Sequence, residues 1–256
     1  MDTGNDVKLP ENAVTGIRGR LTFTMRKYGP VARLAFFISS LVFFLAWMPA
    51  QMRIVIWHGL TARGILSSML LVFSLLAVSL VWSAGQRFDV WAFLFFNVRG
   101  LRPLWLDRMM LGLTQIGSGI VALVIGLFLF LSGDRLLAYE LVLGTLTLWI
   151  VVELLKSLVR RPRPYSILTQ ARIVGFRAGG RSFPSGHTSQ VFFMATLIAL
   201  HFHASAWVVI CLYVLALLVG ITRMYVGAHY PRDVLAGAIL GSAWGLIGVL
   251  VDEYLL

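Results

Sequence analysis

Charged residues are scarce in this sequence. Asp, Glu, Lys and Arg make up 13% of its 256 residues, and hydrophobic residues make up 59%. Soluble domains carry about a quarter of their residues as charged side chains. The composition therefore excludes an ordinary soluble domain and favours a membrane protein.

Cysteine is almost absent as well. Cys211 is the single cysteine, so the chain cannot form an intramolecular disulfide, and its cysteine content does not indicate a redox compartment. The first 33 residues are polar and basic, without the early apolar stretch and small-residue cleavage site of a signal peptide. We expect residues 1–33 to remain attached as a basic polar tail.

Four long runs contain no charged residue. They cover residues 65–84, 109–131, 204–222 and 234–251. Each is close to the roughly 20 apolar residues that a helix needs to span a bilayer. Three less uniform segments also qualify as spans: residues 34–50, 136–155 and 185–203. The sequence therefore predicts an all-α, polytopic membrane helix bundle of six or seven transmembrane helices.

The segment at residues 86–108 mixes aromatic and basic side chains. It is too polar to span the bilayer, and this mixture is typical of an amphipathic segment that lies at the membrane surface. We expect residues 34–85 to form N-terminal transmembrane segments, residues 86–108 an interfacial segment, and residues 109–256 the core helices with the functional site.

Positive charge dominates, with a formal net charge of +11. Seven of the 22 Lys and Arg residues lie between Lys156 and His187, a stretch without an acidic residue. A basic loop beside apolar helices suits an anionic headgroup, and most other basic residues lie at span ends. We therefore expect a lipid bilayer and an anionic lipid as partners, and we do not expect nucleic acid.

Three clusters at the ends of predicted spans carry candidate chemistry, because ionisable groups near the bilayer are costly and often functional. The first cluster contains four cations: Lys156, Arg160, Arg161 and Arg163. Like charges this close repel each other unless an anion lies among them. These side chains either bind an anion or anchor a helix end at the membrane surface.

The second cluster, residues 183–189, is typical of a helix start. Ser185 suits the N-cap, and Gly186 allows a close backbone approach. Free amides at a helix N-terminus bind phosphate, and His187 lies in the same predicted first turn. The alternative is a capped helix with an incidental histidine.

The third cluster, residues 222–233, contains Arg223, His229 and Asp233. Asp233 follows His229 by four residues, so its carboxylate can accept a hydrogen bond from one ring nitrogen and leave the other free to attack. The alternative is a capping aspartate with an interfacial histidine. We expect all three clusters at one membrane face, where together they favour an acid–base site for a phosphate.

These residues resemble the signature of the type 2 phosphatidic acid phosphatase superfamily, also called lipid phosphate phosphatases. The signature reads K-x6-R-P, then P-S-G-H, then S-R-x5-H-x3-D. Lys156 and Arg163 fit its first element, residues 184–187 fit the second, and residues 223–233 fit the third. One position departs from the signature, because Thr222 replaces the serine and keeps a hydroxyl.

The resemblance covers about residues 107–251 and implies a phosphatase that acts on a lipid or polyprenyl phosphate without a metal or another cofactor. It implies that His229 attacks phosphorus and forms a phosphohistidine, that Asp233 holds the tautomer of His229, and that His187 transfers the proton. It assigns the phosphate oxygens to a set of donors: Lys156, Arg163, Ser185, Gly186 and Arg223. The sequence also contains no carboxylate cluster suited to a metal ion.

Other polar residues are interpreted as structural. Three arginines are expected as interfacial anchors in preference to phosphate ligands: Arg160, Arg161 and Arg232. Three residues of the 109–131 run are expected to allow close helix packing: Thr114, Gly117 and Ser118. Glu153 precedes Lys156 by one helical turn and can pair with it.

Charge and family resemblance predict opposite membrane orientations. With seven spans, the positive-inside rule places both the basic N-terminus and the motif loops in the cytoplasm. The resemblance implies a site that faces the periplasm, lumen or exterior. We favour the outward site in the inner (plasma) membrane of a bacterium, which follows if residues 34–50 do not fully span.

The motifs are compatible with several functions. Candidate substrates of a phosphatase are phosphatidic acid, phosphatidylglycerol phosphate, undecaprenyl pyrophosphate and a lipid A phosphate. A phosphotransferase would pass the phosphoryl group from the phosphohistidine to a second lipid. A non-enzymatic transporter or lipid-binding scaffold would hold an anion with the cations and would not need His229. The sequence predicts no particular oligomeric state.

Overall fold

The computed structural model describes residues 63–80, 83–99 and 103–255, together with scattered positions between 35 and 57. The chain divides into two compact units, residues 1–53 and residues 54–256. The first unit falls mostly outside the described residues, and the predicted span at residues 34–50 falls partly outside them, so it stays a prediction. The second unit is a bundle of helices without a strand in its described part, which confirms the predicted all-α class.

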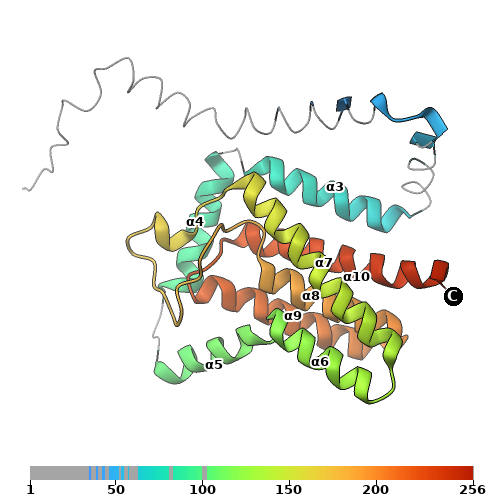
Figure 1. Ribbon diagram of the computed structural model, residues 1–256. Helices are drawn as coiled ribbons and strands as arrows, with labels where there is room; N and C mark the ends of the chain where they lie inside the picture. The colour runs from blue at the N-terminus through green and yellow to red at the C-terminus, as the bar shows by residue number, and fades with distance from the viewer. Residues whose placement is uncertain are drawn as a thin grey trace, which may run out of the picture. The chain divides into compact units, whose positions relative to one another are not determined.

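The described elements follow one another along the chain with short connections, except for one long loop before α8 (Figure 1). They are α3 (Gly64–Ser79), α4 (Ser83–Asn97), α5 (Leu104–Gln115), α6 (Gly119–Leu131), α7 (Arg135–Val159), the 3-10 turn η2 (Pro164–Ser166), α8 (Gly186–His201), α9 (Ala206–Tyr225) and α10 (Pro231–Leu255).

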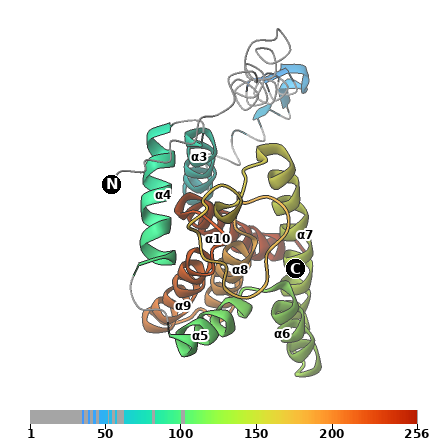
Figure 2. The same ribbon diagram turned by 90° about the vertical axis from the view of Figure 1, so that its left-hand side faces the viewer.

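Helix α8 lies in the middle of the bundle, with α7, α9 and α10 around it (Figure 2). Ten of its 16 residues are buried, including the polar Thr188, Ser189 and Gln190. At 16 residues it is shorter than the span predicted at residues 185–203, and a helix that crosses the hydrocarbon core needs about 20 residues. Helix α8 thus places the residues of its first turns in the interior of the bundle.

A stripe of glycines brings α10 into close contact with α8. The stripe consists of Gly237, Gly241 and Gly245, one on each successive turn of α10. A Cβ atom on Gly237 would lie 2.7 Å from the carbonyl oxygen of Ser185, and one on Gly241 would collide with the carbonyl oxygen of Ser189. The two backbones therefore approach each other in the way that small residues permit between membrane helices.

In the described part of the chain, three single helices are long and apolar enough to cross a membrane: residues Arg135–Ser166, Ala206–Tyr225 and Pro231–Val249. These correspond to three predicted spans. The shorter apolar helix α3 corresponds to the predicted span at residues 65–84. The number of spans, predicted as six or seven, therefore stays a prediction.

The predicted span at residues 109–131 is bent in the structure, where two helices that are together long and apolar enough to cross a membrane form it. Helices α5 and α6 meet at an angle of 54° and are separated by residues 116–118. At the break, a Cβ atom on Gly117 would lie 2.5 Å from the carbonyl oxygen of His187. Ser118 then caps α6 by accepting a hydrogen bond from the amide of Val121 at 3.3 Å. Gly117 thus serves close packing, as the sequence predicted, whereas Ser118 acts as a helix cap and Thr114 bonds to Arg223.

Most of helix α4 belongs to the predicted amphipathic segment at residues 86–108, and this helix has a buried face. Asp89, Phe93 and Asn97 on α4 are fully buried, while neighbouring aromatic side chains are exposed. Helix α4 packs against α9 and α10, and a separate helix, α5, begins at Leu104. The polar groups of the segment therefore point partly inward. Its position at a membrane surface stays a prediction.

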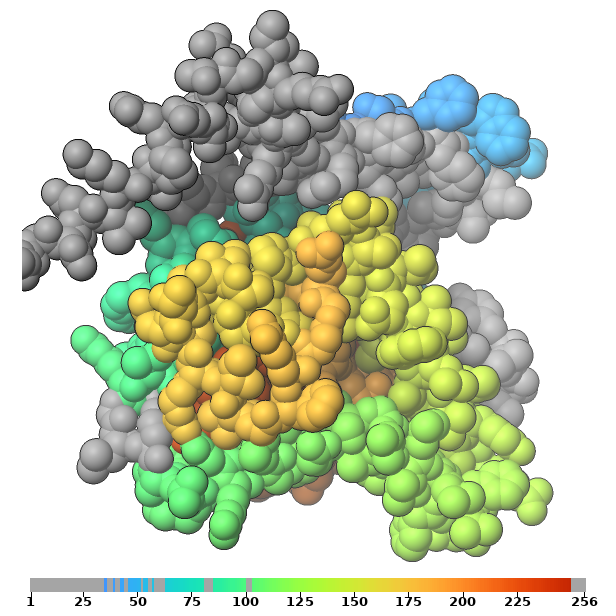
Figure 3. Space-filling model, turned by 60° about the vertical axis from the view of Figure 1, so that its left-hand side comes forward, coloured from blue at the N-terminus to red at the C-terminus, as the bar shows by residue number. Residues whose placement is uncertain are grey.

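The loop between α7 and α8 covers one face of the bundle, where it runs from yellow to orange between α7 and the green helices (Figure 3). Asn97 holds this loop in place: its side-chain amide donates to the carbonyls of Arg172 at 3.0 Å and Tyr225 at 2.8 Å, and its oxygen accepts from the Arg172 amide at 2.7 Å. Arg172 also forms an ion pair with Asp107, which accepts a hydrogen bond from Tyr225. The loop is thereby tied to α4, α5 and α9.

We expect Gly241→Ala to destabilise the protein by about 1–3 kcal/mol, because overpacking of a tight contact costs that much. Thermal unfolding in detergent measures the effect. Gly248→Ala on the same helix is the control, since its Cβ would lie 3.6 Å from Leu197 in ordinary contact. Equal unfolding temperatures for the two variants would contradict the close α8–α10 packing.

Candidate active site

The His229 ring is held in one orientation by a backbone carbonyl. His229 lies in the turn between α9 and α10 and is 2% exposed. Its Nδ1 atom lies 2.7 Å from the carbonyl oxygen of Ser182. A carbonyl oxygen only accepts hydrogen bonds, so Nδ1 carries the proton and Nε2 keeps its lone pair. Nε2 lies 3.1 Å from a guanidinium nitrogen of Arg163, which donates to it.

Burial keeps this ring uncharged. The loss of solvent, together with the nearby Arg163 and Arg223, lowers the pKa of His229 to about 3, although Asp233 opposes this shift. At neutral pH the ring is therefore neutral, and the unprotonated Nε2 accepts the hydrogen bond from Arg163. A neutral imidazole with one nitrogen fixed and the other available is suited to act as a nucleophile.

The turn that carries His229 depends on Gly227. Gly227 has a φ of +91°, in the region that favours glycine. A Cβ atom there would also collide with the carbonyl oxygen of Arg172 in the covering loop. Glycine therefore lets the chain leave α9, pass beneath that loop and present the ring before α10 begins at Pro231.

Asp233 contacts His229 less directly than its spacing predicted. Its Oδ2 atom lies 3.7 Å from His229 Nδ1, which is beyond hydrogen-bond distance. The carboxylate instead accepts hydrogen bonds from the Ser182 hydroxyl, from the Tyr230 amide at 2.9 Å and from Arg161 at 2.6 Å. Asp233 therefore holds Ser182, and the carbonyl of Ser182 holds the histidine.

Arg163 and Arg223 bring positive charge to the free nitrogen of His229. Both side chains are 6% exposed. Arg163 donates to the backbone carbonyls of Gly179 and Ala228, and Arg223 donates to the Thr114 hydroxyl at 2.5 Å. Among the described residues, neither guanidinium forms an ion pair with a carboxylate.

The Nε atom of Arg223 is a further hydrogen-bond donor at this site. It is buried and has no hydrogen-bond partner in the described part of the chain. Buried charges and buried donors without partners are costly, so the arrangement is stabilised when an anion binds among them.

The N-terminus of α8 supplies the remaining predicted groups. Ser185 occupies the N-cap position, but its side chain makes no capping bond and accepts from the Thr188 hydroxyl at 2.9 Å. A Cβ atom on Gly186 would lie 3.9 Å from the ammonium nitrogen of Lys156. Lys156 therefore lies beside the first turn of α8, and it pairs with Glu153 at 2.7 Å, as the sequence predicted.

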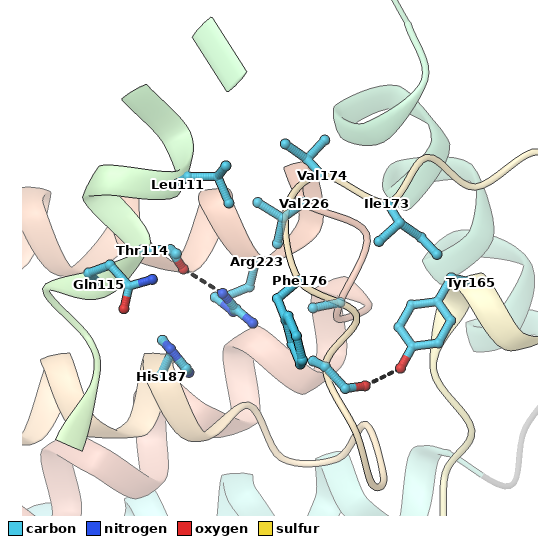
Figure 4. Close-up of a pocket in the computed structure, with 12 residues that line it drawn as sticks. Leu111, Thr114, Gln115, Tyr165, Ile173, Val174, Phe176, His187, Arg223 and Val226 are labelled. Atoms are coloured by element: carbon cyan, nitrogen blue, oxygen red, sulfur yellow. Dashed lines mark hydrogen bonds between the residues drawn. The ribbon is translucent and has the colours of Figure 1, made fainter. Parts of the chain in front are cut away.

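A cavity of about 190 Å³ reaches this group of side chains (Figure 4). His187 and Arg223 line it, and Thr114 is joined to Arg223 by a hydrogen bond. Most of the other lining residues are apolar: Leu111, Ile173, Val174, Phe176, Ala178, Val226 and Ala228. The cavity thus joins a cationic and imidazole surface to a hydrocarbon surface.

The structure corrects the prediction that Arg161 and Arg232 are interfacial anchors. Both are buried, at 7% and 8% exposure, and both bond to Asp89, which is fully buried. Arg160, by contrast, is exposed. The first two arginines look like anchors in the sequence because their carboxylate partner lies 72 and 143 residues away.

The sequence motifs did not point to Asp89 or Ser182. An acidic residue within an aromatic-rich segment was the available signal for Asp89. Ser182 acts through its carbonyl, and a backbone acceptor leaves no mark in the sequence. Within the described residues, no group of three or more His, Cys, Asp or Glu side chains is placed to hold a metal ion.

Comparison with known proteins identifies the family of this chain. Residues 135–255 match the PAP2 superfamily. An undecaprenyl-diphosphatase from Sulfolobus acidocaldarius is 27% identical over 189 residues, which cover 72% of this chain and 90% of that protein. Phosphatidylglycerophosphatase B from Bacillus subtilis is 32% identical over 155 residues, which cover 55% of this chain and 72% of that protein.

A solved structure shares the fold as well. The crystal structure of a transmembrane PAP2 type phosphatidylglycerolphosphate phosphatase from Bacillus subtilis superimposes with a TM-score of 0.65 at 26% identity, over 75% of this chain and 97% of that one. The sequence motifs, the helical bundle and these relatives agree. This chain therefore belongs to the PAP2 superfamily and is a multi-pass membrane phosphatase.

Proposed function

We propose that this enzyme hydrolyses the phosphomonoester or pyrophosphate of a lipid or polyprenyl substrate through a phosphohistidine at His229. One observation carries the proposal. The free Nε2 of His229 faces Arg163, and neither Arg163 nor the nearby Arg223 has a carboxylate partner among the described residues. A phosphate fits this arrangement, because its oxygens balance the cations while its phosphorus meets the nucleophile.

In the first step, the Nε2 lone pair attacks phosphorus, and the bond between phosphorus and the leaving oxygen breaks. Arg163, Arg223 and Lys156 neutralise the phosphoryl oxygens, a task on which phosphoryl transfer mostly depends. As the ring becomes a phosphoimidazolium, its Nδ1–H keeps the bond to Ser182, and the carboxylate of Asp233 at 3.7 Å balances the new positive charge.

His187 carries the proton in both steps of this proposal. When the anionic phosphate binds among the cations, its negative charge favours a protonated His187 ring. This ring donates its proton to the leaving oxygen, so that the lipid departs as an alcohol or as a phosphate. Its neutral ring then takes a proton from water, the water oxygen bonds to phosphorus, and the N–P bond breaks to return neutral His229 and inorganic phosphate. Ser185 and the amide of Gly186, beside His187 at the start of α8, serve as further donors to the phosphate.

The apolar walls of the cavity support a lipid substrate. A phosphate at Arg223 and His187 would have its ester group beside hydrocarbon side chains such as Leu111 and Val174. The named relatives act on undecaprenyl diphosphate and on phosphatidylglycerol phosphate, which fit the proposed substrate class. We propose that the site faces the extracytoplasmic side of a bacterial inner membrane.

We expect His229→Ala to lower turnover by about 10⁴-fold or more, since the variant lacks the attacking nitrogen. Release of inorganic phosphate by detergent-solubilised protein measures this loss. His203→Ala, at an exposed histidine beyond the end of α8, is the matched control and should keep wild-type activity. Substantial turnover by His229→Ala would exclude His229 as the nucleophile.

We expect full activity in excess EDTA, because three cationic side chains take the role that a metal ion has in other phosphoryl transfers. The measurement is phosphate release from phosphatidic acid, phosphatidylglycerol phosphate, undecaprenyl pyrophosphate and a lipid A phosphate, each with and without EDTA. The substrate hydrolysed fastest identifies the physiological class. A strict requirement for added Mg²⁺ would contradict the proposed mechanism.

A further inference from the structure

A buried carboxylate outside the three motifs is connected to the proposed nucleophile. Asp89, in the middle of α4, is fully buried. It forms ion pairs with Arg161 and, at 2.7 Å, with Arg232, and it accepts the backbone amide of Arg232 at 3.2 Å. Asp89 thus meets the loop after α7 and the first turn of α10, the two segments that flank His229.

Arg161 extends this contact to His229. Its guanidinium bridges two carboxylates, bonding Asp89 through one nitrogen and Asp233 through the other. Its own carbonyl accepts the amide of Ser182 at 2.8 Å. Because Asp233 also accepts the Ser182 hydroxyl, Ser182 is fixed from both sides, and its carbonyl can meet His229 Nδ1 at 2.7 Å.

The charges of this group are balanced. Asp89 and Asp233 supply two negative charges, and Arg161 and Arg232 supply two positive charges, all of them buried. Removing the charge of Asp89 would leave one excess positive charge in the interior, next to a ring that becomes cationic when phosphorus binds to it. In a medium of low dielectric constant, such a charge acts over several ångströms.

We propose that Asp89 is a positioning residue for His229, acting through Arg161 on Asp233 and Ser182. The inference rests on the proposed role of His229 as nucleophile. Asp89 does not touch the substrate. It keeps Ser182 in place and keeps the buried charge neutral, so that the ring presents Nε2 and tolerates the positive charge of the phosphoimidazolium.

Substitution of Asp89 by Asn tests the proposal. We expect Asp89→Asn to lower kcat by about 10- to 100-fold with KM changed less than about threefold, because Lys156, Arg163 and Arg223 still bind the phosphate. Turnover is expressed per orthovanadate-binding site, which corrects for unfolded protein. Glu140→Gln, at a buried carboxylate near the start of α7, is the matched control and should keep the wild-type kcat.

A second substitution separates charge balance from loss of packing. In the double variant Asp89→Asn with Arg232→Gln, Arg161 and Asp233 remain as a neutral pair. We expect the double variant to regain at least about tenfold of the kcat lost in Asp89→Asn. A purely structural role predicts the reverse, because the double variant lacks still more hydrogen bonds. If Asp89→Asn binds no vanadate, the double variant decides alone, and we expect it to fold and to turn over.

Three outcomes overturn the proposal: a wild-type kcat in Asp89→Asn, a matching loss in Glu140→Gln, or a folded double variant no more active than Asp89→Asn. His229→Ala is measured alongside. Turnover by His229→Ala would contradict the proposed function itself. An inactive His229→Ala together with a fully active Asp89→Asn would remove only the role of Asp89.

Discussion

The hydrogen bond between the His229 ring and the carbonyl of Ser182 determines what this site can do. Because a carbonyl oxygen only accepts, the bond fixes the proton on Nδ1 and leaves the lone pair on Nε2. The surrounding structure serves this one contact. Asp233 and Arg161 hold Ser182, and Gly227 permits the turn that brings His229 to it. A change in any of these groups would move the nitrogen that we propose as the nucleophile or change which ring nitrogen carries the proton.

Two groups of buried charges lie on either side of this contact. The charges of one group balance each other, whereas those of the other group do not. Behind the ring, two carboxylates and two guanidiniums balance each other, so that group is complete without a ligand. In front of the ring, Arg163 and Arg223 have no carboxylate partner within the described residues. Burial of unbalanced charge is unfavourable, and a phosphate anion removes that cost. The same physical term therefore stabilises the fold on one side and favours the substrate on the other.

The sequence predicted the parts of the structure that depend on local spacing. Long apolar runs predicted α9 and α10, a less uniform apolar segment predicted α7, and the three motifs predicted that His187, His229, Arg163 and Arg223 converge. Contacts between distant segments were not predictable in this way. The arginines that pair with Asp89 lie 72 and 143 residues away from it in the sequence, and no local pattern predicts these ion pairs. The break after α5 was not predicted either, because it occurs where the chain contacts the backbone of α8. A Cβ atom at position 117 would collide with the carbonyl oxygen of His187.

The nucleophilic role of His229 is tested most directly by trapping the covalent intermediate. Wild-type enzyme is mixed with a lipid phosphate, quenched in alkali within the first turnover because phosphohistidine is labile in acid, and digested for mass spectrometry of the peptide that contains residues 222–233. We predict a phosphoryl group on His229, attached through Nε2. A phosphoryl group on His187, or turnover with His229 unmodified at every time point, would contradict the mechanism.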